Sequence, residues 1–476
     1  MSSESKKEVE NNSSNNSKFT KPLKFLFVSH DALIGDLAWQ IKKEGHKVRY
    51  YIRNKDQQDV CDGFVEKTDD LLEAKDWADI IVFDDVGFGD LAESWRKAGK
   101  LIVGGTKYTD KLELDRAFGQ EEMKNFGMNI LPNWSFTDFD EAISFVKKNP
   151  ARYVLKPSGI AQDEKELLVV GEEEDGNDIL QILEHYKKTW AAKIKSFILQ
   201  KYVSGVEVAI GAFFNGKEFI FPVNINFEHK RMFPGDIGPM SGEMGTAMFF
   251  SPQNNLFNST LAKMKDKLSE SGYVGYIDIN CIVDGKGIHP LEFTVRFGYP
   301  HISIAMEGVL SEWGEFLYAL ASGENGKQIE LKTKRGFQVG IVIAVPPFPF
   351  NDPKAFKKYS EDAVILFKKN PKSYNEKNDK FENNKTDSKS KKNQLIEFPE
   401  GVHLGDVKFI DDDLHLAGNS GYALIITGSG STMEDARKQA YNRVKNIILP
   451  YMFYRTDIGE KWPQDSDRLQ TWGYLW

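Results

Sequence analysis

Residues 289–300 read HPLEFTVRFGYP, and residues 277–280, a short distance upstream, read IDIN. In each stretch polar and apolar residues alternate, so the polar side chains share one face of a predicted strand. Oxygen donors on two adjacent strands suit Mg²⁺, which binds hard oxygen ligands together with phosphates and waters. The candidate metal ligands are Glu292, Thr294, Asp278 and Asn280.

Cationic side chains accompany these acids. Arg296 falls on the same predicted face as Glu292, where it can hold a carboxylate or a phosphate. Lys156 ends the run YVLK before a Pro-Ser-Gly turn, from where a lysine can project into a cleft and bind phosphate. Each feature has a plainer interpretation. The strand with Glu292 and Arg296 can be a salt-bridged polar face of a sheet, and Lys156 can be a surface lysine at the end of a strand. Spacing alone favours the plainer interpretations.

The segment 235–249, GDIGPMSGEMGTAMF, is dense in glycine and lies between predicted sheet and predicted helix. Glycine permits positive φ and close backbone approach to a ligand, and successive amides can form an anion-binding nest. The cations His229, Lys230 and Arg231 directly precede this segment. They count against the alternative, a long flexible connection. The glycines suited to ligand binding are Gly235, Gly238, Gly242 and Gly245.

The order of predicted elements indicates several domains with α/β and α+β character. Strands alternate with helices over residues 22–106, which predicts a doubly wound α/β domain with ligands at the carboxyl ends of its strands. Residues 107–335 mix helices with antiparallel sheet, and residues 336–476 form a small mixed α/β domain. Residues 1–21 and 368–394 are polar and low in complexity, so we expect a disordered tail and a solvated insertion.

Bulk composition excludes several classes of protein. A length of 476 residues predicts two to four domains, and a net charge of −8 argues against a general nucleic-acid binder. No run approaches the ~18 apolar residues of a membrane span. The two cysteines, Cys61 and Cys281, are expected to be free thiols in a reducing cytoplasm. No nucleophile–base pair or Walker A motif is present, which favours phosphate and metal chemistry without a covalent enzyme intermediate.

Five segments, in order along the chain, resemble glycinamide ribonucleotide synthetase (phosphoribosylamine–glycine ligase), a family with the ATP-grasp fold. VLKPSGIAQDEKE is similar to the family's VVKADGLAAGKG, and LQKYVSGVEVA to EEFLxGxExS. EHKRMFPGDIGPMSGEMG is similar to a DHKR-like segment followed by GPNTGGMG. LEFTVRFGYPH is similar to LEFNxRFGDPE, and AYNRVKNIILPYMFYRTDIG to AYxxVxxI…YRxDIG. The resemblance extends from about Lys24 to Gly459 and implies an ATP-grasp domain over residues 107–335.

The resemblance implies a role for each matching residue. Residues implied to bind ATP, with the stretch 200–203 as the adenine hinge, are Arg116, Lys156, Lys165, Gln200, Lys201, Tyr202, Val203 and Glu207. Residues implied to bind substrate are His229, Arg231, Gly238, Ser241, Gly242 and Gly245. Arg296 and Lys230 are the implied catalytic residues. The implied cofactors are ATP and Mg²⁺ or Mn²⁺.

The resemblance also implies a reaction. A substrate carboxylate attacks the γ-phosphate of ATP to give an acyl phosphate and ADP, and an amine then displaces phosphate to form an amide. The implied substrates are glycine and phosphoribosylamine, in purine biosynthesis. We expect a cytoplasmic monomer or weak homodimer without nucleic-acid or membrane partners.

Motifs on the acceptor side depart from the family. This chain has VSHDALIGDLAW where the family has GSGGREHALAW, and DDVGFGDL where the family has GPEAPL. It also has RFGYPH in place of RFGDPE, and Thr294 in place of an asparagine. These departures leave two alternatives: a ligase of the same fold acting on another amine or carboxylate, and a non-catalytic nucleotide-binding protein. If Asp31 and Asp36 point into the cleft, phosphoribosylamine is disfavoured.

Overall fold

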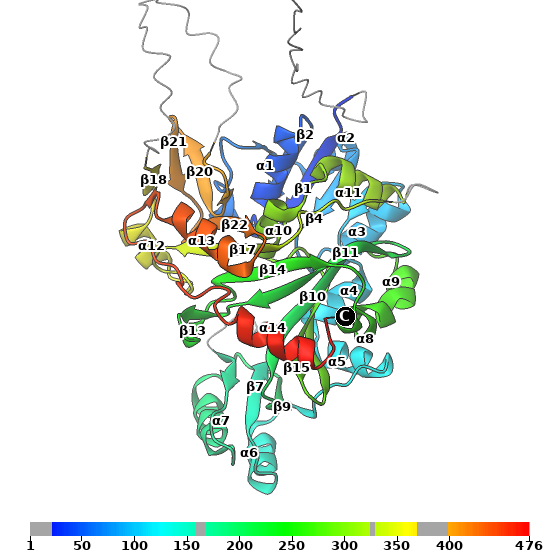
Figure 1. Cartoon of the computed structure of the whole chain (residues 1–476), viewed down its shortest axis with the longest axis vertical. Helices are drawn as coiled ribbons and strands as arrows, with labels where there is room; N and C mark the ends of the chain where they lie inside the picture. The colour runs from blue at the N-terminus through cyan, green and yellow to red at the C-terminus, as the bar shows by residue number, and fades with distance from the viewer. Residues whose placement is uncertain (1–20, 159–166, 324–328, 369–397, 476) are drawn as a thin grey trace, which may run out of the picture.

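A computed structural model describes residues 21–158, 167–323, 329–368 and 398–475 of the chain (Figure 1). Lys165 and nearly all of the predicted tail and insertion lie outside these residues. Among the described helices, none has the length and apolar character needed to cross a membrane. Cys61 and Cys281 are buried free thiols, and burial raises the pKa of Cys61 to about 12.

The N-terminal part is a parallel sheet with the strand order β3-β2-β1-β4-β5. Its strands are β1 (Lys24–Ser29), β2 (Lys47–Ile52), β3 (Glu66–Lys67), β4 (Ile80–Phe83) and β5 (Leu101–Val103). Alternate residues of β1 enter two different apolar cores, Phe25 and Phe27 in one and Leu26 and Val28 in the other. Because both faces of the sheet are buried at its centre, β1, β4 and β5 are nearly continuous apolar runs. The doubly wound fold predicted for this region is confirmed.

Helices cover both faces of this sheet and lead into the next part of the chain. They are α1 (Gly35–Lys43), α2 (Leu71–Trp77), α3 (Gly89–Lys97), α4 (Lys107–Leu114) and α5 (Arg116–Asn125). The charged stretch from Lys107 to Asn125 forms two helices, α4 and α5, which are separated at Asp115. Asp115 has extended backbone angles, and its side chain accepts a hydrogen bond from the Phe118 amide at 3.1 Å, so it caps α5.

An eight-stranded antiparallel sheet forms the centre of the molecule (Figure 1), in the order β16-β15-β10-β11-β14-β17-β22-β19. Its strands are β10 (Val206–Asn215), β11 (Phe219–Glu228), β14 (Gly245–Ser251), β15 (Val274–Asp284), β16 (Gly287–Thr294), β17 (Phe337–Ala344), β19 (Val402–Leu404) and β22 (Tyr422–Gly430). One face packs on α10 (His301–Gly308), where Ile304 lies against Gly340. The other packs on α13 (Met433–Val444) and α14 (Trp462–Thr471).

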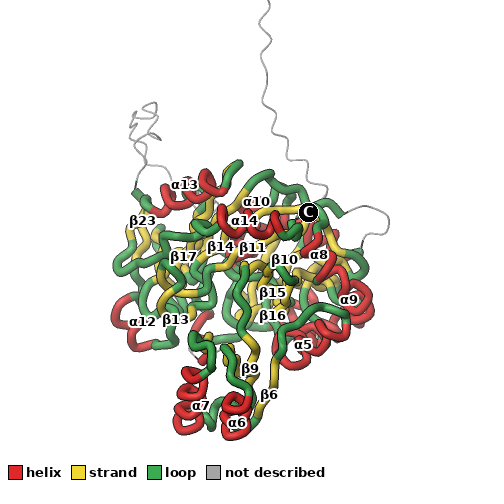
Figure 2. Tube along the Cα trace, turned by 60° about the horizontal axis from the view of Figure 1, so that its bottom comes forward, coloured by secondary structure: helices red, strands yellow, loops and turns green. Residues whose placement is uncertain are grey.

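A smaller sheet, β6-β9-β7-β8, projects from the body of the molecule with α6 and α7 on its outer side (Figure 2). These elements are β6 (Asn133–Phe136), α6 (Phe139–Lys148), β7 (Tyr153–Pro157), β8 (Val169–Val170), α7 (Asn177–Thr189) and β9 (Phe197–Lys201). It has an apolar core of its own. Strands β9 and β10 follow each other closely in the sequence but belong to different sheets, with residues 202–205 between them.

The remaining elements complete the helical and C-terminal parts. They are α8 (Asn255–Ser259), a 3₁₀ turn (Leu261–Met264), α9 (Lys265–Ser271), α11 (Trp313–Ser322), α12 (Pro353–Tyr359), β18 (Val364–Phe367), β20 (Val407–Ile410), β21 (Asp413–Leu416) and β23 (Ile447–Ile448). The four strands form a sheet in the order β20-β21-β18-β23. The glycine-dense segment is not a loop between sheet and helix. It contains β13 (Ile237–Met240), which forms a hairpin with the preceding strand β12 (Arg231–Phe233), and Gly245 begins β14.

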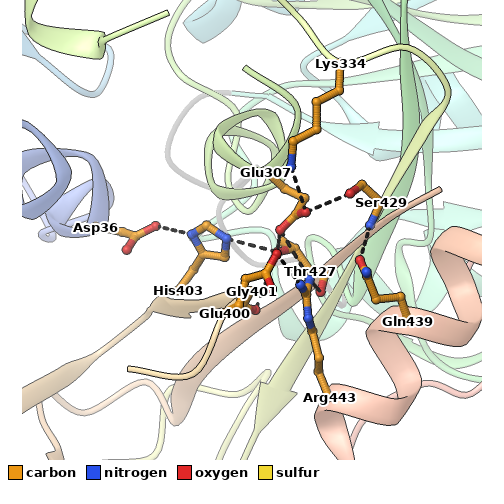
Figure 3. A network of polar contacts seen from close by, with 10 residues as sticks. All are labelled: Asp36, Glu307, Lys334, Glu400, Gly401, His403, Thr427, Ser429, Gln439 and Arg443. Atoms are coloured by element: carbon orange, nitrogen blue, oxygen red, sulfur yellow. Dashed lines mark hydrogen bonds and ion pairs between the residues drawn. The ribbon is translucent and has the colours of Figure 1, made fainter. Parts of the chain in front are cut away.

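A polar network joins the N-terminal part, α10 and the C-terminal part (Figure 3); we call it the three-way joint. Asp36 in α1 accepts hydrogen bonds from the Ser303 hydroxyl at 3.0 Å and the Leu404 amide at 3.1 Å, and its other contact is His403 Nδ1 at 2.8 Å. His403 Nε2 lies 3.0 Å from the Thr427 hydroxyl. Asp36 and His403 are 367 residues apart in the sequence, so the joint depends on the tertiary fold.

Glu307 of α10 occupies the other end of the joint (Figure 3). Its carboxylate accepts from the hydroxyls of Thr427 and Ser429, each at 2.9 Å, and lies 3.2 Å from Lys334 and 3.3 Å from Arg443. Burial alone would raise the pKa of Glu307, but Arg443, Lys334 and the two hydroxyls lower it below the ordinary value. The carboxylate is therefore fully paired, and the three parts are held together through it.

Candidate functional site

A cavity of about 660 Å³ lies between the small sheet, the edge of the eight-stranded sheet and α14. Most of the residues predicted to bind ATP, substrate or metal or to act in catalysis line it. These are Arg116, Lys156, Gln200, Lys201, Tyr202, Val203, Glu207, His229, Lys230, Arg231, Gly242 and Glu292. Lys156 and Glu292 thus face one cavity, as a single nucleotide site requires. Other predicted residues do not line it: Arg296, Gly238, Ser241, Gly245, Thr294, Asp278 and Asn280.

Opposite charges meet at the floor of this cavity. Arg116 Nη1 lies 2.6 Å from Glu292 Oε2, and Lys230 Nζ lies 3.8 Å from Glu292 Oε1. Lys230 also pairs with Glu207 at 2.9 Å and Glu228 at 3.3 Å. Burial lowers the pKa of Lys230, but these carboxylates outweigh it and raise the pKa well above its usual value. Lys230 is therefore a permanent cation at neutral pH.

Lys156 lies in the same cluster but is shifted in the opposite direction. Burial lowers the pKa of Lys156 to about 8, and the nearby charges of Arg116 and Lys230 add to that effect, against the influence of Glu292. A buried ammonium group close to other cations is favourable only when an anion joins it. This combination suits the phosphates of a nucleotide.

The predicted adenine hinge follows β9. The backbone amides of Lys201 and Tyr202 donate to the carbonyls of Pro132 and Arg152 at 2.9 and 3.0 Å, which fixes the path of the chain. The Arg152 guanidinium lies 3.6 Å from the centre of the Tyr202 ring. A rigid segment that joins two sheets at the mouth of a cavity can hold a flat ring by its backbone.

Several lining residues were not predicted from the sequence. Val154 of β7 and Arg152, directly before that strand, line the cavity together with Lys156, because alternate residues of an extended chain share a face. Counting back by two from Lys156 would have found them. Trp462, Asp465 and Arg468 line the cavity from one side of α14. Their helical spacing is visible in the sequence, but the docking of α14 is not.

Buried Arg455 anchors the glycine-rich hairpin beside this cavity. Its guanidinium pairs with Asp236 at 3.0 Å and Asp457 at 2.7 Å, and it donates to the Arg231 carbonyl at 2.8 Å. The Gly235 amide donates to Asp457 at 2.9 Å. The segment YRTDIG thus holds the hairpin in place. Because this amide is already bonded within the protein, it is not part of an anion-binding nest.

His229 is buried beneath the same hairpin. Burial, followed by the charge of Arg455, lowers the pKa of His229 to about 4. The imidazole is therefore neutral at physiological pH. It contributes no positive charge to the cavity, contrary to the expectation from the sequence.

The strands that carry the predicted metal ligands pair as expected. Asp278 lies opposite Thr294, and Asn280 lies opposite Glu292, in the register of β15 and β16. Only Glu292 of these four residues reaches the cavity. The described residues contain no group of three acidic, histidine or cysteine side chains arranged to hold a metal. The arrangement fits Mg²⁺, which is commonly held by one or two carboxylates and completed by phosphate oxygens and water.

Arg296 lies away from the cavity, contrary to the expectation from strand spacing. Strand β16 ends at Thr294, and Arg296 Nε contacts Glu113 at 3.0 Å and Asp85 at 3.1 Å. Carboxylates from two other elements therefore hold the guanidinium. Of the loop acids, Asp36 is in the three-way joint and Asp31 accepts from Asn54 at 2.7 Å, so neither lines the cavity.

Comparisons with protein families match most of the chain. A model described as phosphoribosylglycinamide synthetase, ATP-grasp (A) domain, matches residues 114–302. A second, described as the C domain of the same synthetase, matches residues 363–461. The two matches do not overlap and together span more than half of the sequence.

Individual proteins give the same result at low identity. Phosphoribosylamine–glycine ligase of Streptococcus pneumoniae is 23% identical over 392 residues, which cover 79% of this chain and 82% of that one. The ligase of Halalkalibacterium halodurans is 22% identical over 448 residues, covering 89% and 94%.

Solved structures share the fold. Phosphoribosylamine–glycine ligase of Thermotoga maritima superposes with a TM-score of 0.65 at 19% identity, covering 92% of this chain and all (100%) of that one. The biotin carboxylase domain of Hydrogenobacter thermophilus 2-oxoglutarate carboxylase, in complex with MgADP, gives a TM-score of 0.60 at 12% identity, covering 95% and 98%.

Proposed function

The chain belongs to the phosphoribosylglycinamide synthetase family, and from that premise we propose that it is a phosphoribosylamine–glycine ligase. It couples the conversion of ATP to ADP to the formation of an amide from the glycine carboxylate and the phosphoribosylamine amine. The observation that supports this most directly is the meeting of Arg116, Lys156, Lys230 and Glu292 in one cavity.

The proposed roles follow from position and charge. Lys156 and Arg116 bind the triphosphate, because each presents a cation to the interior of the cavity. The hinge 200–203 holds the adenine, and Glu207 contacts the ribose. Lys230 neutralises the charge that develops as the γ-phosphoryl group is transferred. These assignments make positioning and charge neutralisation the main contributions of the protein.

Glu292 is the proposed Mg²⁺ ligand in the cavity, with Asn280 opposite it in the sheet. A bound Mg²⁺ supplies charge neutralisation on the phosphate oxygens worth several kcal/mol. Arg116 and Lys230, which hold Glu292 in the structure, keep its carboxylate oriented toward the cavity. Thr294 and Asp278 lie one step further along the same strand pair.

The chemistry proceeds in two balanced steps. A carboxylate oxygen of glycine attacks the γ-phosphorus, the bond to the β-phosphate oxygen breaks, and ADP leaves. The amine nitrogen then attacks the acyl carbon, the bond to the phosphate oxygen breaks, and phosphate leaves while the nitrogen loses a proton. Both steps need the reactants held in line, which a cavity with fixed cations at its floor provides.

The direct test is ADP release with purified protein, ATP, Mg²⁺, glycine and phosphoribosylamine. Turnover that requires all four reactants supports the proposal. Replacing the amine by hydroxylamine would trap the acyl phosphate as a hydroxamate, with release of phosphate. Absence of both ADP and hydroxamate would overturn the proposed activity.

A second candidate, a ligase of the same fold with another amine, is favoured by one observation. The carboxyl end of β4, where a doubly wound sheet binds ligands, carries Asp84 and Asp85. Burial and the charge of Asp85 raise the pKa of Asp84 to about 8. Hydroxamate formation from glycine, without turnover on phosphoribosylamine, would support this candidate over the first.

A further inference from the structure

Beside the nucleotide cavity the eight-stranded sheet carries a group of polar residues that we call the acidic subsite: Glu228, Glu243, Asp278, Asn280 and Thr246. Glu228 and Thr246 lie directly opposite each other in the pairing of β11 with β14. Asn280 Nδ2 donates to Glu228 Oε2 at 3.1 Å. Asp278 is two residues before Asn280 on β15, so the two side chains share a face of the sheet. Glu243 lies just before β14 and is close enough for Glu228 and Asp278 to act on it.

The cations near the acidic subsite are paired with carboxylates other than Glu243 and Asp278. Lys230 pairs with Glu207 at 2.9 Å and with Glu228 at 3.3 Å. Arg296, the cation that acts on Asp278, is held by Glu113 at 3.0 Å and by Asp85 at 3.1 Å. Glu243 and Asp278 are therefore in excess of the positive charge around them.

Polar atoms in the subsite are buried without a partner among the described residues. Asn280 is 4% exposed and its Oδ1 has no hydrogen bond; Thr246 is 0% exposed and its hydroxyl has none. The same is true of Glu243 Oε1. Buried polar atoms are normally paired, because desolvating them without a hydrogen bond is costly. A bound N–H donor with positive charge would pair with these atoms and balance the excess of carboxylates.

The donor set suits an ammonium group better than a metal ion. Carboxylate, amide and hydroxyl oxygens all accept N–H donors. The described residues contain no group of three acidic, histidine or cysteine side chains arranged to hold a metal, although three carboxylates act on one another here. The subsite is also joined to the reaction centre, since Lys230 lies 3.3 Å from Glu228 and 3.8 Å from Glu292.

We propose that the acidic subsite binds the α-ammonium group of the amino acid whose carboxylate is phosphorylated beside Lys230, and that Glu243 determines the preference for an amino acid over a carboxylate without an ammonium group. This inference rests on the proposed ligase function. Glu243 stands in GPMSGEMG where the similar family motif, GPNTGGMG, has a glycine. The Glu243 carboxylate is therefore present in this chain but not in the family motif that it resembles.

The test compares wild type with Glu243→Gln, which removes the charge and keeps the shape. Glycine is titrated in the presence of Mg²⁺ and a non-hydrolysable ATP analogue, and ADP release is measured with glycine and with glycolate, which has a hydroxyl in place of the ammonium. We expect Glu243→Gln to bind glycine at least tenfold more weakly, with the affinity for the ATP analogue and the KM for glycolate unchanged. The matched control is Glu218→Gln, an exposed carboxylate 3.7 Å from Lys265, which should behave as wild type.

The outcomes separate the subsite from the ligase function. Unchanged glycine affinity in Glu243→Gln, or an equal loss for glycine and glycolate, would overturn the subsite. Wild type that binds glycine through Glu243 but releases no ADP would overturn the ligase function and leave the subsite standing. No saturable glycine binding by wild type would overturn the subsite. If Glu243→Gln unfolds at lower temperature than the control, Glu243→Ala provides the second variant, with the same expected loss.

Discussion

The nucleotide cavity and the three-way joint are both clusters of charged side chains, but they differ in how the charges are paired. At the joint, Glu307 is held by two cations and two hydroxyls, and its pKa is lowered. Beside the cavity, the pKa values of Glu243 and Asp278 are raised, and that of Lys156 is lowered to about 8. The three shifts beside the cavity disfavour the charged form, whereas the shift of Glu307 favours it. Fully paired charges mark a structural joint, whereas charges left partly unpaired mark a site that awaits a ligand.

Of the substitutions that test this contrast, we expect the one at Glu292 to have the largest effect on activity. Glu292→Ala removes the proposed metal ligand from the cavity and should abolish ADP formation, since metal charge neutralisation is worth several kcal/mol. The fold should be intact, because the side chain is half-exposed at the edge of the large sheet. Steady-state ADP release and thermal unfolding measure the two quantities. Activity near the wild-type level would refute the metal assignment.

The joint should show the opposite pattern. Glu307→Ala leaves Arg443 and Lys334 without their carboxylate and should lower the free energy of unfolding by about 3 kcal/mol, as for other broken buried pairs. ATP affinity should stay at the wild-type level, since Glu307 does not line the nucleotide cavity. Denaturant unfolding and ATP titration provide the two measurements. A variant as stable as wild type would show that the joint does not hold the parts together.

The pH dependence of ATP binding tests the lowered pKa of Lys156. Below pH 8 the free protein carries the ammonium group, and above it the group loses its proton. ATP affinity should therefore fall by up to about tenfold per pH unit above pH 8 until the bound-state pKa is reached. The matched comparison is Lys156→Arg, which stays charged and should bind ATP with a flatter profile. Identical slopes in the two proteins would exclude Lys156 as the titrating group.

The smallest expected effect concerns Arg152, which the sequence did not single out. Arg152→Leu removes the cation over the Tyr202 ring and should weaken ATP binding by about 1 kcal/mol, the usual size of such an interaction. The KM for ATP should rise a few-fold, with kcat unchanged. A loss confined to kcat would show that Arg152 acts on the phosphates rather than on the hinge.

Local sequence patterns predicted the parts of the fold that depend on local spacing. The parallel N-terminal sheet followed from alternating apolar runs and helices, and the pairing of Asp278 with Thr294 followed from two strands joined by a short turn. The break between α4 and α5 at Asp115 cannot be predicted from the sequence, because the charged helical pattern continues across the cap. A capping aspartate and a helix-interior aspartate look alike without the backbone angles.

Long-range arrangement could not be predicted. The partners of Arg296 come from two segments far earlier in the chain, so strand spacing placed it wrongly on the cavity face. His229 looked like a cation beside an anion loop, but burial under the hairpin keeps it neutral. The side chains of α14 reach the cavity only because that helix packs across the large sheet. In each case tertiary packing decided the charge or position of the side chain.

The transfer of an oxygen atom tests the central claim most directly. Glycine labelled with ¹⁸O in its carboxylate is incubated with the protein, ATP, Mg²⁺ and phosphoribosylamine, and the released phosphate is examined by mass spectrometry. If the carboxylate attacks the γ-phosphorus in the cavity of Lys156 and Glu292, each phosphate carries one ¹⁸O atom from glycine. Unlabelled phosphate released along with ADP would contradict the acyl-phosphate route.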